Sequence, residues 1–270
     1  MSGNSIAYIL LGISIVPIVL GYTWLIIASF SNRTEGLFPK DAAGGIGGWT
    51  LQNWSFLADP LVWRLTLNSF IIAAGMVVGV GFISSLAGYA LSRMNFTGRR
   101  SFLSLTLILH AFPGVTLLIA IFFVLRFTTR IPGIGPLFGY NTIGGVALVM
   151  ISLELPLGIW LMKGFFDNVS WDMERSALID GASRYRVWWQ IILPQIKPGL
   201  AALSVFTFII GWSAYLIPAT FTIGTRVANL PVYLNQLQSD TAPTNWNTVA
   251  ALGLFQLIPI LVFFIFTQEL

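Results

Sequence analysis

The chain has 270 residues, of which 56% are hydrophobic and only 9% are charged, and its formal net charge at pH 7 is +4. A soluble domain carries about a quarter charged residues, so this composition excludes an ordinary soluble enzyme and indicates an integral membrane protein. The basic residues are scattered along the chain, which argues against a nucleic-acid partner. Cysteine is absent, so disulfides and thiolate metal sites are excluded.

Long apolar windows recur along the whole sequence. Each can supply about 20 helical residues, enough to cross a hydrocarbon core of about 30 Å. None alternates with the period of 2 that barrel strands show, so an all-α polytopic membrane protein is expected. The first window is too long, and too poor in basic residues, for a cleaved signal peptide. The predicted spans lie near residues 6–30, 66–92, 102–125, 142–163, 199–224 and 247–267.

The distribution of basic residues gives an orientation for these spans. The short loop 93–100 holds three arginines and no acid, and the loop 163–197 holds five basic residues, against six in the opposite loops. Short loops rich in Lys and Arg stay in the cytoplasm. An even number of spans places both termini on one side, so we expect both termini and the loop 163–197 in the cytoplasm.

The loop 163–197 is the longest charged and amphipathic stretch of the chain. Ser170 can cap a helix whose first turns hold Asp172 and Glu174, where the helix dipole favours acids. Gly181 can adopt the left-handed conformation that ends such a helix. A second short helix is expected after it, carrying Trp188. The residues alone leave two interpretations open: an amphipathic hairpin lying on the bilayer, or a docking surface for a water-soluble partner.

A longer pattern in this loop resembles the cytoplasmic EAA loop of permease subunits in binding-protein-dependent ABC importers. Glu174 takes the place of the first glutamate of that pattern, whereas Arg175 and Ser176 depart from it. The positions in register are Ala177, Asp180, Gly181, Ala182, Ile191, Leu193, Pro194 and Pro198. The resemblance extends over about residues 65–268 and is closest to carbohydrate permeases of the maltose type. The Trp-Asn-Glu common in that family's fifth span is Trp212-Ser213-Ala214 here.

The resemblance implies a type I importer permease fold, with residues 1–64 as a first span and outer loop and residues 65–270 as a five-helix core. It implies that the loop, at 166–197, carries a coupling helix that docks on an ATPase, with Asp172 and Glu174 offering carboxylates to basic groups there. Implied partners are two ATPase subunits, a second and different permease, an extracytoplasmic solute-binding protein and the lipid of a bacterial or archaeal inner membrane. The coupling residues would be Asp172, Glu174, Ala177, Asp180, Gly181, Ala182, Leu193 and Pro194.

The chain has no phosphate-cradling sequence of its own. Such a loop needs Gly-Lys-Ser/Thr, and the only lysines are Lys40, Lys163 and Lys197, none of which follows a glycine. We therefore expect no cofactor and no enzymatic activity in this chain, with ATP and Mg²⁺ bound by the partner ATPase.

Polar residues inside the expected spans are costly in lipid unless they face a pathway or a partner helix. Packing between helices and contact with a small polar solute, such as a sugar, both remain open for each of them. A proton-coupled secondary transporter using Glu154 and His110 is the main alternative function, and an intramembrane protease using Ser213 and His110 is a weaker one. The candidate pathway residues are Asn68, His110, Glu154, Trp212, Tyr215 and Gln256.

Overall fold

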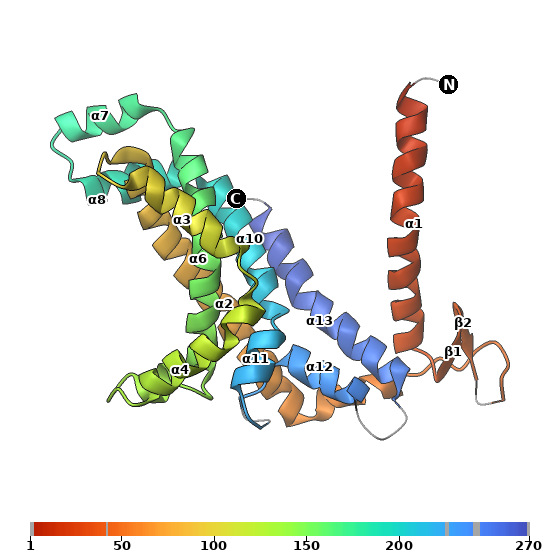
Figure 1. Cartoon of the computed structure of the whole chain (residues 1–270). Coiled ribbons are helices and arrows are strands. Elements are labelled where there is room, and N and C mark those ends of the chain that lie inside the picture. Colours follow the sequence, from red (N-terminus) through yellow and green to blue (C-terminus); the bar gives the residue numbers. More distant parts are fainter. Residues whose placement is uncertain (1–2, 42, 225–226, 240–243, 269–270) are drawn as a thin grey trace. The chain divides into compact units, whose positions relative to one another are not determined.

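The computed structural model describes residues 3–41, 43–224, 227–239 and 244–268, and most of these residues are helical (Figure 1). Contacts divide the chain into two compact units. One comprises Met1–Arg64 with Leu230–Pro259, and the other comprises Leu65–Asn229 with Ile260–Leu270. The predicted division into a first span with an outer loop, residues 1–64, and a five-helix core, residues 65–270, stays a prediction.

The first unit contains a long apolar helix, a small hairpin and the helices near the C-terminus. Strands β1 and β2 are antiparallel, with Arg33 opposite Lys40. Its elements are α1 (Gly3–Ser29), β1 (Arg33–Glu35), β2 (Phe38–Lys40), η1 (Gln52–Ala58), α12 (Leu230–Ser239) and most of α13 (Trp246–Thr267).

Two buried asparagines close the C-terminal end of α1, where carbonyl groups lack partners within the helix. The Asn247 side-chain amide donates to the carbonyl oxygens of Ala28 at 2.9 Å and Ser31 at 2.7 Å. The Asn53 amide donates to the carbonyl oxygens of Ser29 at 3.1 Å and Ser31 at 2.8 Å. The C-terminal end of α1 is therefore held by side chains from two other segments of the first unit.

The second unit holds the remaining helices, of which α2 begins in the first unit. These are α2 (Pro60–Arg93), α3 (Arg99–Ala111), η2 (Gly114–Leu117), α4 (Leu118–Thr129), α5 (Gly135–Phe138), α6 (Ile143–Asp167), α7 (Trp171–Ile179), α8 (Arg184–Arg186), η3 (Val187–Ile192), α9 (Leu193–Gln195), α10 (Lys197–Trp212) and α11 (Leu216–Phe221).

Glycines let α2 and α6 approach closely in the second unit. A Cβ on Gly88 would lie 2.9 Å from the Cβ of Met162, and one on Gly158 would lie 2.5 Å from the Ser84 Oγ. Small residues at such crossings are typical of membrane helices, which pack without a hydrophobic driving force from water. The α2–α6 pair forms the support on which the loop after α6 rests.

Within the described residues, four helices are long and apolar enough to cross a membrane: Ala7–Ser29, Pro60–Arg93, Ile143–Asp167 and Trp246–Thr267. Two further pairs meet the same test only when each bent pair counts as one span, which gives up to six. The polytopic helical fold is therefore confirmed. The expectation of continuous helices over 102–125 and 199–224 is wrong.

The third expected span is broken at Pro113, where α3 and the segment Gly114–Thr129 meet at 93°. Proline has no N–H for the carbonyl of Leu109, four residues earlier. The N–H of Phe112 bonds that carbonyl instead, at 3.3 Å. Phe112 is extended (φ −75°, ψ 128°), as steric contact with a following proline favours. The helix therefore ends before the expected span is complete.

The fifth expected span ends at Trp212, and a short separate helix, α11, follows it. In a continuous helix the Ala214 carbonyl would accept from residue 218, which is a proline without an N–H. The Asn229 side-chain amide takes that place and donates to the Ala214 carbonyl oxygen at 2.7 Å. A partner distant in sequence thus satisfies the carbonyl that the proline leaves free.

Candidate functional site

The loop after α6 lies at the end of the second unit where α3 begins, away from α4 (Figure 1). It consists of α7, a turn, and the consecutive segments α8, η3 and α9 that lead into α10. The segment Arg184–Gln195 meets α10 at 81°. The loop therefore lies across the ends of the long helices rather than continuing them.

Helix α7 begins and ends where the sequence predicts. The Ser170 side chain accepts from the Asp172 N–H at 3.2 Å. At the other end Gly181 has φ +86°. The Ala182 N–H bonds the Ala177 carbonyl at 3.0 Å, and the Gly181 N–H bonds the Leu178 carbonyl at 3.1 Å. This pair of bonds is the Schellman arrangement, in which glycine tolerates the left-handed position.

The second helix of the loop contains a widened segment that the sequence did not predict. Ser183 caps its start, accepting from the Arg186 N–H. Residues Val187–Ile192 then form a π-helix, in which residues five positions apart share a face. Val187 and Ile192 are accordingly both buried, together with Trp188. The widened turn directs one apolar face of the loop toward the long helices.

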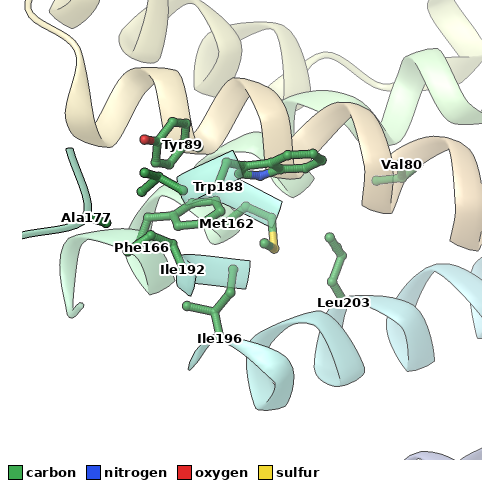
Figure 2. Close-up of a cluster of buried hydrophobic side chains, with 10 residues drawn as sticks. Val80, Tyr89, Met162, Phe166, Ala177, Trp188, Ile192, Ile196 and Leu203 are labelled. Carbon is green, nitrogen blue, oxygen red and sulfur yellow. The ribbon is translucent and has the colours of Figure 1, made fainter. Parts of the chain in front are cut away.

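A hydrophobic cluster fixes this apolar face on the ends of α2, α6 and α10. Figure 2 shows Trp188 lying beside Phe166 and Met162 of α6, with Tyr89 of α2 and Ala177 of α7 nearby. Trp188 is 1% exposed, whereas Trp189 is 54% exposed. The amphipathic hairpin that was left open would place Trp188 on the bilayer, but the protein covers the ring of this residue.

A polar network lies beside the cluster and centres on Glu174, which is 1% exposed. The Tyr89 hydroxyl donates to its Oε1 at 2.7 Å. The Nε of Arg93 lies 3.2 Å from its Oε2, and the Nη1 of Arg184 lies 3.7 Å from its Oε1. Glu174 is therefore surrounded by groups of its own chain.

This burial corrects the expectation that Glu174 offers its carboxylate to a partner. The carboxylate of Glu174 contacts Tyr89 and Arg93, and these groups shield it from water. Ala177 is buried on the same inner face of α7. Both residues position α7 on this chain, and they are not part of the face that another protein can touch.

The outer face of α7 carries the residues that remain accessible. Ile179 is 85% exposed, the largest exposure among the exposed apolar side chains of the described residues. The outer face comprises Asp172, Met173, Arg175, Ser176, Ile179 and Asp180.

The remaining residues predicted for coupling lie around this helix. Asp180 and Gly181 are exposed at its end, and Pro194 is exposed on α9. Ala182 and Leu193 are partly buried against the cluster that holds Trp188. The structure thus divides the predicted set into an outer group, which can reach a partner, and an inner group, which holds the loop.

Arg93 is the important residue that the sequence reasoning missed. It was noted only for the positive charge of the loop 93–100, yet its guanidinium is buried and contacts Glu174. Tyr89 and Glu174 are 85 residues apart in sequence, and Arg93 lies four residues after Tyr89. A basic residue at the end of a span, in register with a tyrosine one turn earlier, is the only signal the sequence offered.

Two of the predicted pathway residues, Asn68 and Trp212, are buried in the second unit. In this conformation Asn68 is buried and donates to the Ala228 carbonyl oxygen at 2.7 Å. Trp212 is buried and stacks with Phe208 at a centroid distance of 6.1 Å. These contacts lie within the second unit, and the role of both residues in a pathway stays a prediction.

The other pathway candidates differ in their surroundings. His110 lies within electrostatic range of Glu154, whose Oε2 is buried without a hydrogen-bond partner. Tyr215 is exposed at the break between α10 and α11. Gln256 is on the part of α13 that belongs to the first unit. Their role in a pathway stays a prediction.

Comparison with known proteins gives consistent matches along the chain. The family model "Binding-protein-dependent transport system inner membrane component" matches residues 79–270. The maltodextrin transport system permease protein MdxG of Bacillus subtilis is 31% identical, with 95% of this chain and 89% of that protein covered. The galactooligosaccharides transport system permease protein GanQ of the same organism is 32% identical, with 97% and 90% covered.

A solved structure shares the fold. A chain of a bacterial ABC transporter involved in the import of the acidic polysaccharide alginate superimposes with a TM-score of 0.79. The match covers 98% of this chain and 95% of that chain, at 20% sequence identity. At this identity the likeness concerns the arrangement of the helices, which agrees with the type I importer permease fold expected from the loop.

Proposed function

We propose, from its membership of the binding-protein-dependent transport system inner membrane component family, that the chain forms half of the translocation pathway of a sugar importer. It receives ATP-driven motion from a partner ATPase at the outer face of α7. The chain is a multi-pass transport permease and not an enzyme. The intramembrane protease and the proton-coupled transporter are therefore set aside.

The observation that carries the ATPase proposal is the outer face of α7. Ile179 projects from the last turn of a helix that is capped at both ends and fixed from beneath by Trp188 and Glu174. A rigid helix with an exposed apolar residue and neighbouring charges suits insertion into a groove of a partner. The ATPase binds ATP and Mg²⁺, and this chain contributes no cofactor site.

The direction of transport and the remaining partners follow from the same proposal. The ATPase side is the cytoplasm, so the loop 163–197 and both termini face inward. A solute-binding protein delivers solute from outside, and a second, related permease completes the pathway. The names of the relatives, which refer to maltodextrin and galactooligosaccharides, support a sugar or sugar-like solute.

Purification of the tagged chain from its native membrane tests the ATPase proposal. We expect the complex to hydrolyse MgATP, which this chain cannot do alone. Ile179→Asp should lower the recovered ATPase activity at least about tenfold, because hot-spot residues at interfaces contribute about 2 kcal/mol or more. Ile223→Asp is the matched control, since Ile223 is also an exposed isoleucine but follows α11. Equal recovery with both variants would reject docking at α7.

The solute class has a separate test. The purified complex with its solute-binding protein is reconstituted in vesicles and supplied with maltodextrin, a galactooligosaccharide or an amino acid. We expect uptake of a sugar that requires ATP. ATP-dependent uptake of the amino acid alone would remove the sugar assignment and leave the permease assignment intact.

A further inference from the structure

The guanidinium of Arg93 joins three segments of the chain. Arg93 is the last residue of α2, and its side chain is 0% exposed. Its Nη2 donates to the carbonyl oxygens of Phe166 at 2.8 Å and Val169 at 2.6 Å, at the end of α6 and in the connection to α7. Its Nε lies 3.2 Å from Glu174 on α7.

A neighbouring aromatic ring and a second polar group complete the arrangement. The guanidinium carbon lies 4.5 Å from the ring centroid of Trp171, the first residue of α7. Tyr89, one turn before Arg93 on the same face of α2, donates to the other oxygen of Glu174 at 2.7 Å. Both ends of the first turn of α7 are thereby held to the last turn of α2.

Stability alone does not account for a buried arginine here. Removal of a charged pair from water costs several kcal/mol per ion, and well-packed apolar residues often stabilise a fold equally well. The planar guanidinium instead has donors in fixed directions, which an apolar side chain lacks. Its hydrogen bonds to the carbonyls of Phe166 and Val169 fix the end of α6 and the connection to α7, and its charge fixes Glu174.

Arg93 makes two kinds of contact, hydrogen bonds to backbone carbonyls and an ionic contact with Glu174. The bonds to Phe166 and Val169 are short, whereas the Nε of Arg93 and the Oε2 of Glu174 are not aligned as a hydrogen bond. The contact between Arg93 and Glu174 is therefore ionic. Arg93 of α2 is hydrogen-bonded to the end of α6 and to the connection that follows it. It holds α7 by its charge, and the Tyr89 hydroxyl adds a hydrogen bond to Glu174.

We propose that Arg93 is a positioning residue for energy coupling, which joins α2, α6 and α7 at the cytoplasmic end so that motion of α7 reaches the spans. The proposal rests on the docking of an ATPase at α7. Without Arg93, α7 still presents its outer face, because that face contains none of these groups. Binding of the ATPase and transmission of its motion are thus separable.

A cysteine at Tyr215 reports on the spans without knowledge of the solute. The chain has no cysteine, so Tyr215→Cys introduces a single thiol at the exposed break between α10 and α11. Its labelling by a water-soluble maleimide is measured in the purified complex, with and without MgATP and vanadate. With Arg93 intact, we expect trapped nucleotide to change the labelling rate about tenfold, within the range of about 5 to 150-fold typical of coupling between sites.

Two Arg93 variants are compared in this background. Arg93→Met combined with Glu174→Met removes both buried charges, and Arg184, which loses its contact with Glu174, is exposed to water. No buried charge therefore remains unpaired, and folding is preserved. We expect normal recovery of the ATPase and a labelling rate that changes less than about twofold with nucleotide. Arg93→Lys keeps the charge but has one nitrogen in place of the separate Nη2 and Nε, and it should give an intermediate response. Arg100→Met, at an exposed arginine of α3, should respond like the parent.

The outcomes separate this inference from the function on which it rests. A full nucleotide response in the double methionine variant, with normal ATPase recovery, overturns the role of Arg93. If the parent complex itself contains no ATPase, the proposed docking fails first, and the inference falls with it. If the double variant does not assemble, Arg93→Lys decides: a parental response overturns the proposal, and a partial one supports it.

Discussion

Helix α1 and the loop that contains α7 both lie in a membrane protein, but they are held by opposite means. None of the most apolar window of α1 is buried inside the protein, and its contacts are concentrated at the asparagine-capped end. The loop has fewer apolar residues, yet it buries Trp188 and Glu174 completely. Apolar side chains place a segment in lipid, whereas directed polar contacts and shape fix its position on neighbouring helices.

Truncation of Trp188 should give the largest effect on stability. Trp188→Ala leaves a cavity beneath the loop, and we expect a loss of about 3–5 kcal/mol in the free energy of unfolding. The adjacent Trp189→Ala, at an exposed site, should change it by less than about 0.5 kcal/mol. Thermal unfolding in detergent measures both. A similar loss for the two variants would show that the loop is not anchored through Trp188.

Removal of the Asn247 side-chain amide should have the second largest effect on stability, and this effect should be local to the C-terminal end of α1. Asn247→Ala leaves the carbonyls of Ala28 and Ser31 with fewer donors, which costs about 1–3 kcal/mol for buried polar groups. We expect faster proteolysis in the segment after α1, monitored by limited digestion. Asn95→Ala is the control, since Asn95 is an exposed asparagine of the second unit. Unchanged digestion of the Asn247 variant would contradict the anchoring role.

A side chain at Gly181 should cost less. Gly181 has φ +86° with open space where a Cβ would lie, so Gly181→Ala adds only backbone strain, about 1–2 kcal/mol. Gly164→Ala, inside α6 and equally open, should instead be neutral or stabilise the helix by up to about 1 kcal/mol. Opposite signs in thermal unfolding are the expected result. Stabilisation by both substitutions would mean that α7 does not end in a left-handed turn.

The smallest effect is expected on the lipid-facing side of α1. Ile18→Val removes one methylene from an exposed position, and the unfolding free energy should stay within about 0.5 kcal/mol of the parent. The same change at Ile192, which is buried in the loop cluster, should cost about 0.5–1.5 kcal/mol. Equal costs at both positions would remove the contrast between the two regions.

The sequence predicted the elements that depend on local chemistry. Apolar length located four of the spans as continuous helices, Ser170 marked the start of α7, and Gly181 marked its end. Proline was a weaker signal, because α6 continues through Pro156 whereas the third span breaks at Pro113. Whether a proline ends a helix depends on the partners available for the carbonyl it leaves, and these come from elsewhere in the chain.

The contacts on the inner side of the loop after α6 could not be predicted either, because they also come from elsewhere in the chain. Glu174 was expected to face a partner, because the resemblance to the EAA loop implies that its carboxylate docks on an ATPase. Its partners Tyr89 and Arg93 lie on another helix, and only the folded arrangement brings them together. Of the outer face, the sequence pattern predicted Asp172 and Asp180, whereas the exposure of Ile179 required the structure.

Labelling of a single cysteine at Ile179 tests the central claim most directly. In the cysteine-free chain, Ile179→Cys should react with a membrane-impermeant maleimide in inverted vesicles stripped of the ATPase, and should stay unreactive in intact spheroplasts. Addition of the ATPase subunits should then block the reaction. Labelling from outside the cell, or labelling that the ATPase does not reduce, would contradict an inward-facing α7 that receives ATP-driven motion.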